Sequence, residues 1–278
     1  MNRKRLRLVF ILVVIVRVLV AHAQSREPQH PGMPFSGNQQ FPRGLGTLPI
    51  AFEANLGQIR KDAKFVSRGL SYSAYLTAEG MVLSLKPNSQ RETTAAAHDR
   101  TLKPPTILQF NLLGSAANPP AVGEMQLPGR VNYFLGQDPR RWRTNVPLYS
   151  RVRYKGVYPG IDLVYYGNTQ RLEYDFEVSP GANPNLIRFE VKGAKQLDLD
   201  ANGDLVLKTN AGELHFQCPV IYQKKNGRQL PVEGSFTIEN STHVSFHVGP
   251  YDANQRLVID PVLLYSTYFG GDGTDEPH

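Results

Sequence analysis

Polar and apolar residues alternate at every second position through much of this chain. In residues 172–178, the apolar set Leu172, Tyr174, Phe176 and Val178 occupies one face, and acidic residues occupy the other. This period of two is typical of a strand with one buried face, because successive side chains point to opposite sides. Residues 243–248 show the same alternation. The Asn-Gly turn signal at residues 202–203 separates two further alternating runs.

Shorter runs of the same kind predict additional strands. They fall at residues 64–67, 73–76, 81–85, 107–113, 162–166, 187–191 and 235–238. The chain contains 24 Gly and 21 Pro, which separate these runs at the short intervals typical of antiparallel sheets. No stretch shows the convincing apolar spacing of an amphipathic helix. The sequence therefore predicts an all-β protein of the antiparallel β-sandwich type.

The strand-rich region exceeds the about 100 residues of one immunoglobulin-type sandwich, so two β subdomains are expected. Either the low-complexity stretch 87–105 or the Pro/Gly-rich stretch 114–129 would separate them. We expect a small N-terminal β subdomain at residues 47–127 and a larger β-sandwich subdomain at residues 128–263.

The N-terminus has the three-part layout of a secretory signal peptide at residues 1–23. Four basic residues precede an apolar run at residues 8–20, and Ala21 and Ala23 supply small residues before the expected cleavage site. An uncleaved anchor is the alternative, but the run is shorter than the ~20 residues that span a bilayer, and Arg17 interrupts it. Residues 24–46, rich in Pro, Gly, Gln and Ser, predict a flexible linker. We expect export to the extracellular space or cell surface, or to a periplasm, with no stable membrane span after cleavage.

The charge of the chain changes once this segment is removed. The formal net charge is +7, and the expected signal peptide holds five of the 31 Lys and Arg residues. The remaining 26 basic and 24 acidic residues give a net charge of +2. Nucleic acid is therefore not expected as a partner, because such binding needs an excess of clustered basic residues. The single cysteine, Cys218, cannot form an internal disulfide and is interpreted as a structural thiol.

Basic and aromatic residues are interleaved at residues 140–155. Such a segment can bind an anionic glycan through paired and stacked contacts, or its arginine stems can pack over aromatic rings at a sheet surface. Asp162 and Glu173 are available as ion-pair partners in the second interpretation. The candidate ligand face consists of Arg141, Trp142, Arg143, Tyr149, Arg151 and Arg153.

Residues 198–204 resemble the first half of a calcium loop, with Asp198, Asp200, Asn202 and Asp204 at alternate positions. The twelfth position of an EF-hand loop would need a bidentate acid, and it is occupied by Thr209. A plain β-hairpin explains the same stretch, so we expect no metal here, although calcium stays open.

Three acidic residues, Glu173, Asp175 and Glu177, share one strand face, with Asp162 expected on a neighbouring strand. Such carboxylates can form the pair that a glycosidase requires, yet any half-buried strand shows this alternation. The two histidines of residues 243–247 lie too far apart on a strand to share a zinc ion. The sequence shows no phosphate loop, Cys-x-x-Cys pair or nucleophile elbow, so we expect neither an enzyme nor a cofactor.

Near the end of the chain, the stretch IDPVLLYSTYFGG at residues 259–271 predicts an apolar strand, a corner and a second strand. This stretch resembles the start of repeats called SBBP, which are predicted to form β-propellers in large bacterial surface proteins. Two aromatic-rich blocks at residues 131–167 and 172–184 resemble the uncharacterised all-β domain that precedes those repeats. The resemblance implies that residues 264–278 begin a truncated propeller-type repeat, and it implies no activity.

These observations lead to three functional hypotheses. The first is a non-enzymatic exported display module that caps a β-propeller array at the cell surface, with the downstream repeats as its partner. The alternative is a standalone carbohydrate- or matrix-binding β-sandwich module. A glycoside-active enzyme comes third. An unpaired apolar edge at residues 263–269 would favour the first hypothesis, because such an edge calls for a missing partner.

Overall fold

The computed structural model describes residues 50–69, 71–86, 104–168, 171–225 and 227–265. The expected signal peptide and linker, and most of the expected repeat start, lie outside the described residues. The described residues all belong to one compact unit. Strands make up most of the described residues, and the helices among them are two short 3-10 turns, η1 (Pro139–Arg141) and η2 (Pro184–Leu186).

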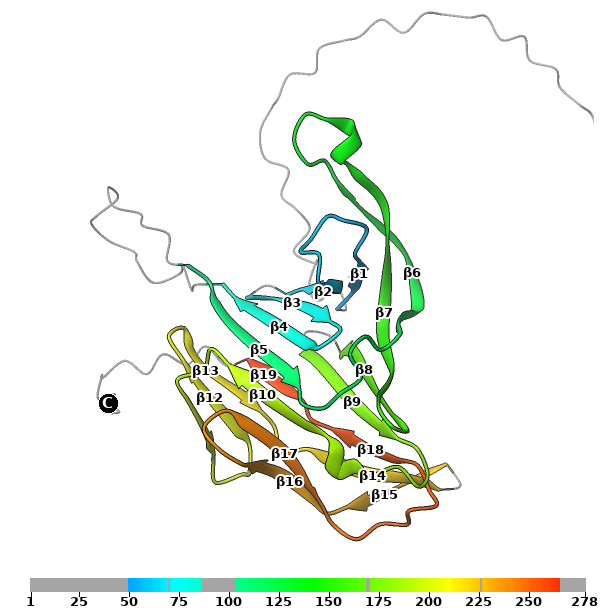
Figure 1. The fold of residues 1–278 in the computed structure, drawn as a ribbon, viewed down its shortest axis with the longest axis vertical. Coiled ribbons are helices and arrows are strands. Elements are labelled where there is room, and N and C mark those ends of the chain that lie inside the picture. The colour runs from blue at the N-terminus through cyan, green and yellow to red at the C-terminus, as the bar shows by residue number, and fades with distance from the viewer. Residues whose placement is uncertain (1–49, 70, 87–103, 169–170, 226, 266–278) are drawn as a thin grey trace, which may run out of the picture. The chain divides into compact units, whose positions relative to one another are not determined.

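Most strands belong to one large antiparallel sheet (Figure 1). Its order is β15-β14-β18-β9-β8-β7-β1-β2-β3-β4-β5-β10-β17-β16, and β6 pairs with β7. The first strands are β1 (Phe52–Ala54), β2 (Ala63–Arg68), β3 (Tyr72–Thr77), β4 (Gly80–Leu85), β5 (Thr106–Leu112), β6 (Ala121–Tyr133), β7 (Arg143–Tyr158) and β8 (Ile161–Asn168). The others are β9 (Arg171–Val178), β10 (Arg188–Lys192), β14 (Val220–Lys225), β15 (Arg228–Val232), β16 (Gly234–Ile238), β17 (His243–Val248) and β18 (Leu257–Asp260).

A small sheet of four strands has the order β11-β12-β13-β19. Its strands are β11 (Gln196–Leu199), β12 (Leu205–Thr209), β13 (Gly212–Phe216) and β19 (Leu263–Tyr265). Phe216 of this sheet packs its ring 5.3 Å from that of Phe110 on β5 and 6.3 Å from that of Tyr174 on β9. The two sheets therefore share one apolar core, as burial of one face of each sheet requires.

The structure confirms the all-β antiparallel class. Every strand expected from alternation at residues 64–248 is present, and the hairpin at residues 202–203 joins β11 to β12. On β9 the apolar positions are buried as the pattern predicts, since Phe176 and Val178 are each 1% exposed. The subdomain boundary expected near Leu127 falls inside β6, and β5 and β10, from either side of it, pair with each other.

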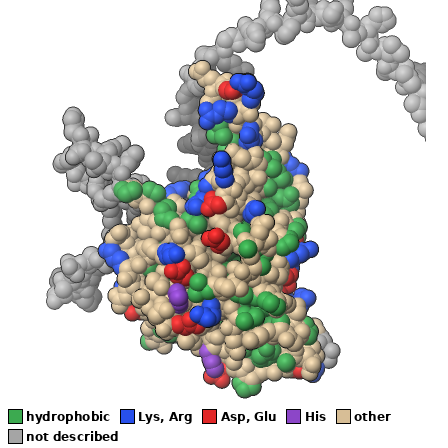
Figure 2. All heavy atoms as spheres, viewed as in Figure 1, with side chains coloured by type: hydrophobic (Ala, Val, Ile, Leu, Met, Phe, Trp, Pro, Cys, Tyr) green, Lys and Arg blue, Asp and Glu red, His purple; other side chains and the backbone are tan. Residues whose placement is uncertain are grey.

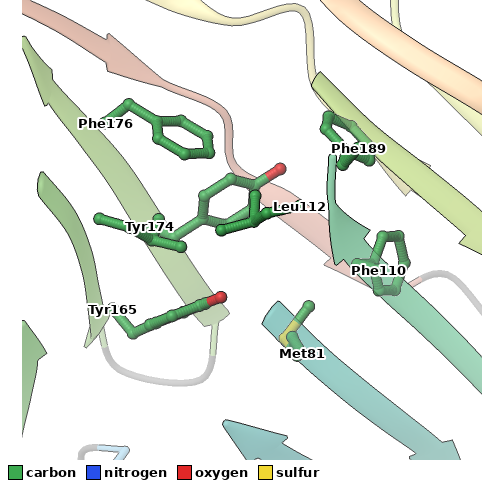
Figure 3. Close-up of a pocket in the computed structure, with 8 residues that line it drawn as sticks. Met81, Phe110, Leu112, Tyr165, Tyr174, Phe176 and Phe189 are labelled. Atoms are coloured by element: carbon green, nitrogen blue, oxygen red, sulfur yellow. The ribbon is translucent and has the colours of Figure 1, made fainter. Parts of the chain in front are cut away.

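One cavity lies in the core, between strands from the two halves of the large sheet (Figure 3). Its lining is apolar and aromatic: Met81, Phe110, Leu112, Leu163, Tyr165, Tyr174, Phe176 and Phe189. The space open to a solvent-sized molecule is about 20 Å³, which is room for a single water. This cavity is a packing gap of the core, and it is too small for an organic ligand.

The hairpin of β6 and β7 projects beyond the rest of the sheet (Figure 1). Near its base, β7 pairs with β6 on one side and β8 on the other. We define the distal arm as residues 125–147, which contain the outer parts of both strands and η1. Two non-glycine residues with positive φ, Met125 (53°) and Asn145 (58°), lie in it, and the strand register shifts there. Such bulges twist an exposed strand pair away from regular pairing. Among the described residues, no helix has the length and apolarity needed to cross a membrane.

Candidate functional site

The tip of the distal arm, residues 134–142, is a hydrogen-bonded loop that presents aromatic side chains to solvent. Asp138 accepts a hydrogen bond from the backbone N of Arg140 at 3.0 Å, and Pro139 begins η1, a typical N-cap arrangement. Trp142 donates its Nε1–H to the carbonyl of Gly136 at 3.0 Å. The rings of Trp142 and Phe134 meet edge to face at 5.1 Å, while Phe134 stays 63% exposed. The sequence folds this loop into an ordered shape that leaves apolar surface uncovered.

The arginines of the distal arm are bound mainly by neutral groups. Arg143 donates to the carbonyls of Leu56, Arg140 and Trp142, at 2.8, 3.1 and 2.9 Å. Arg130 donates to two carbonyls of its own strand. Arg141 has no side-chain partner among the described residues.

The distal arm contains one carboxylate, Asp138, which pairs with Arg140 at 3.1 Å. Residues 125–147 hold four arginines and this one acid, so the distal arm carries a formal charge of +3. Figure 2 shows these basic side chains gathered over the end of the arm.

The arm is fixed to β1, β2 and the loop after β1 at the outer ends of its two strands, next to the tip. Tyr133 donates its hydroxyl to the carboxylate of Glu53, which is 7% exposed on β1. Arg68 of β2 lies 3.3 Å from the same carboxylate and 5.9 Å from the Tyr133 ring. The Arg143 bond to Leu56 adds a second tie to the loop after β1. The tip is therefore held at a defined place relative to the sheet.

At the base of the arm, Arg151 and Arg153 lie in a network of carboxylates. Arg153 contacts Glu177 at 2.8 Å, Glu124 at 2.7 Å and Asp162 at 3.0 Å, and Arg151 contacts Glu177 at 2.8 Å. The hydrogen bond to Glu177 raises the pKa of Arg153. Burial tends to raise the pKa of Glu177, but hydrogen bonds and charges from the two arginines hold it below its ordinary value. These arginines are neutralised within the fold.

Tyr149 belongs to neither group. Its ring packs edge-on against Phe65 at 6.0 Å. The ring also covers Gly123, where an added Cβ would lie 2.5 Å from Tyr149. The sequence-predicted ligand face is therefore split. The structure brings Arg141, Trp142 and Arg143 together at the tip, packs Tyr149 in the sheet, and places the two base arginines in the ion network.

The acidic face of β9 joins this network but also contains a second pair. As expected, Asp162 lies directly opposite Glu177 on the neighbouring strand. Asp175 lies two residues before Glu177 on β9. Burial raises the pKa of Asp175 to about 7, and the nearby charge of Asp260 adds to the increase. Tyr166 donates its hydroxyl to Asp175 Oδ1 at 2.8 Å and lies 3.5 Å from Asp260. Sequence reasoning missed Asp260, because β18 becomes the neighbour of β9 only through the fold.

A further cluster forms at the turn between β11 and β12. Single ligand atoms of Asp200, Asp204 and His215 all lie within 4.8 Å of one another, and all three residues are half-buried. Asp198, the first position of the expected calcium loop, instead pairs with Lys208 at 3.0 Å. The expected calcium half-loop therefore contributes two of its acids to the cluster. The third member, a histidine from β13, could not be identified from its spacing along the chain. The two histidines of β17 lie on one strand, at its first and fifth residues.

The model of a family described as a domain of unknown function (DUF7948) matches residues 52–262. None of the curated proteins and none of the solved structures matches the chain. The matched range includes the distal arm, the ion network and the acidic pair.

Proposed function

The chain belongs to the DUF7948 family of domains of unknown function, and we propose that it is a non-enzymatic exported module that binds an anionic polysaccharide through its distal arm. The observation that carries the proposal is the tip itself. It presents an exposed edge-to-face aromatic pair on a distal arm whose formal charge is +3. The expected signal peptide supports export.

The chemistry of the tip suits an acidic sugar polymer. A guanidinium forms paired hydrogen bonds with a carboxylate or sulfate group, and Arg141 is available for such contacts among the described residues. Sugar rings stack on exposed aromatic faces because their C–H surfaces are apolar, and Trp142 and Phe134 provide such faces. The defined position of the tip lowers the entropy that binding must overcome.

The proposal places no reaction on the acidic residues. Glu177 and Asp162 are occupied by arginine, and the described core cavity is lined by none of the acidic residues of β9. The enzyme hypothesis therefore stays third.

The experiment is affinity chromatography of the full chain on heparin and on a polyuronate column. The double variant Arg140→Glu/Arg141→Glu is preferred to one at Arg143, because Arg143 ties the tip to Leu56. We expect the wild type to be retained and this variant to elute at a much lower salt concentration, since screening weakens contacts between exposed charges.

The matched control is Lys225→Glu/Arg228→Glu. Lys225 and Arg228 are exposed and lie opposite one another on β14 and β15, and the two substitutions change the net charge by the same amount as the tip variant. Retention of the control with loss of the tip variant supports the proposal. Equal retention of both variants, or equal loss, would assign binding to overall charge or to another surface and would refute it.

The display role is the second candidate, and the path of the chain at β19 favours it. Leu263 is 4% exposed, and β19 pairs with β13 and forms one edge of the small sheet. The YSTYFGG stretch that resembles a bacterial SBBP repeat therefore begins at the last residue of a strand anchored in the domain. The described residues of the expected edge are therefore paired on one side, and Leu263 is buried, whereas a fully unpaired and exposed strand was expected for a missing partner. Sequencing the locus beyond the codon for His278 tests this candidate: repeated YSTY-x-GG units support it, and their absence removes it.

A further inference from the structure

We propose that Asp200, Asp204 and His215 form a binding site for a borderline divalent transition-metal ion of the Zn²⁺ type. The three side chains come from the β11–β12 turn and the neighbouring strand β13. Their ligand atoms already lie within 4.8 Å of one another. Small side-chain rotations bring such a set to the spacing that ligands have around one metal ion.

The backbone holds the two carboxylates in place and leaves part of each one available. Asp200 Oδ1 accepts hydrogen bonds from the backbone N of Asn202 at 2.8 Å and of Asp204 at 2.9 Å. Asp204 Oδ1 accepts one from the backbone N of Cys218 at 2.8 Å. No hydrogen bond is found to the Oδ2 atom of either residue within the described part of the chain. Each carboxylate is therefore oriented through one oxygen and can bind a metal through the other.

The electrostatics of the cluster favour a cation. Two carboxylates this close repel each other when both are ionised. Among the described residues, no lysine or arginine forms an ion pair with either one, whereas Asp198 in the same hairpin has Lys208. A bound divalent ion would supply the missing positive charge at the centre of the three side chains.

The histidine determines the class of metal. Calcium binds oxygen ligands, so the half-loop alone would suggest calcium. An imidazole nitrogen beside two carboxylates is a donor set of borderline transition metals such as zinc. Glu213 Oε2 lies 3.5 Å from Nε2 of His215, so a third carboxylate faces the ring, as is common for metal-binding histidines.

The test is calorimetric titration of the chelator-treated full chain with ZnCl₂, CaCl₂ and MgCl₂, alongside thermal unfolding with each salt. We expect one high-affinity zinc equivalent that raises the melting temperature. The variants His215→Gln and Asp204→Asn should each weaken that affinity by more than about tenfold. Asp204→Asn keeps an oxygen that can accept the Cys218 backbone bond, so its fold is preserved.

The matched control is His247→Gln, which removes an exposed histidine of β17 that is not part of the cluster. This variant should bind zinc as the wild type does. Zinc affinity that is unchanged in both cluster variants would overturn the proposal, because the ion would then bind elsewhere. Preference for calcium over zinc, or no binding of any of the three metals, would overturn it as well.

Discussion

Two groups of arginines on the same hairpin meet different surroundings. At the base, Arg151 and Arg153 contact three carboxylates from β6, β8 and β9. In the distal arm, the arginines contact mainly backbone carbonyls or, for Arg141, no described side chain. The difference arises because the base of β7 has strands on both sides, whereas the distal arm is a two-stranded ribbon over most of its length. One residue type thus serves stability at the base and remains available for binding at the tip.

The largest effect is expected for Arg153→Met. This change leaves Glu177, Glu124 and Asp162 close together without their shared cation, and Arg153 is only 16% exposed. We expect the free energy of unfolding to fall by about 3 kcal/mol. Urea unfolding followed by tryptophan fluorescence and circular dichroism measures it.

The comparison is completed by Arg141→Met at the tip. Because Arg141 has no described side-chain partner, its loss should change stability by less than about 0.5 kcal/mol. Equal destabilisation by the two variants would mean that the distal arginines are as structural as those at the base.

The next effect concerns pH and separates two carboxylates of β9. Glu177 faces arginines, and its pKa is lowered, whereas Asp175 faces Asp260, and its pKa is raised to about 7. The folded state therefore binds a proton at Asp175 that the unfolded state has released, across the window from the ordinary value of 3.8 to about 7. Stability falls as pH rises through that window, and the loss is complete above it. Arg151 opposes this shift, and the charge of Glu177 adds to it.

Asp175→Asn should remove this pH dependence. The variant keeps an oxygen that accepts the Tyr166 hydroxyl and cannot ionise. At pH 8 we expect it to be more stable than the wild type by about 2 kcal/mol, with little difference at pH 4. Chemical unfolding of both proteins at several pH values measures the difference. A constant difference at every pH would show that Asp175 does not titrate within this window.

The contrast between base and tip also explains which strands and which candidate residues could be predicted from the sequence. Strands with one buried face, such as β9, follow directly from their alternation. The strands β6 and β7 were not predicted from the sequence. Most of the distal arm is at least partly exposed, so neither face of these strands requires an alternating pattern of apolar residues. The sequence also did not show which of the six candidate residues would be paired with carboxylates, since Arg143 and Arg151 lie only eight positions apart in the same segment. Which of them meets a carboxylate depends on strand register, which arises from pairing with residues distant in the chain.

A smaller effect is expected for Gly123→Ala at the base. A Cβ at this position would lie 2.5 Å from the Tyr149 ring, which would have to move from its contact with Phe65. We expect a loss of about 1–2 kcal/mol, because displaced rings and overpacking carry this cost. The matched control is Gly129→Ala in the distal arm, where the nearest atom is a methyl of Leu148 at 3.3 Å. Thermal unfolding of both variants compares the base and the tip without changing any charge.

A still smaller effect on global stability is expected for Trp142→Ala. The change removes the edge-to-face contact with Phe134 and the hydrogen bond to Gly136, yet Trp142 is already 37% exposed and far from the shared core. We expect the free energy of unfolding to fall by less than about 1 kcal/mol, since exposed aromatic pairs contribute about that much. Hydrogen exchange at residues 134–142 should accelerate while exchange in β8 and β9 stays unchanged, because stability is distributed locally. Retention on the polyanion column should fall as well. If this variant instead unfolded the whole sheet at lower denaturant concentration than Arg153→Met, the tip would be part of the cooperative core, and the division of the hairpin into a stabilising base and a binding tip would be wrong.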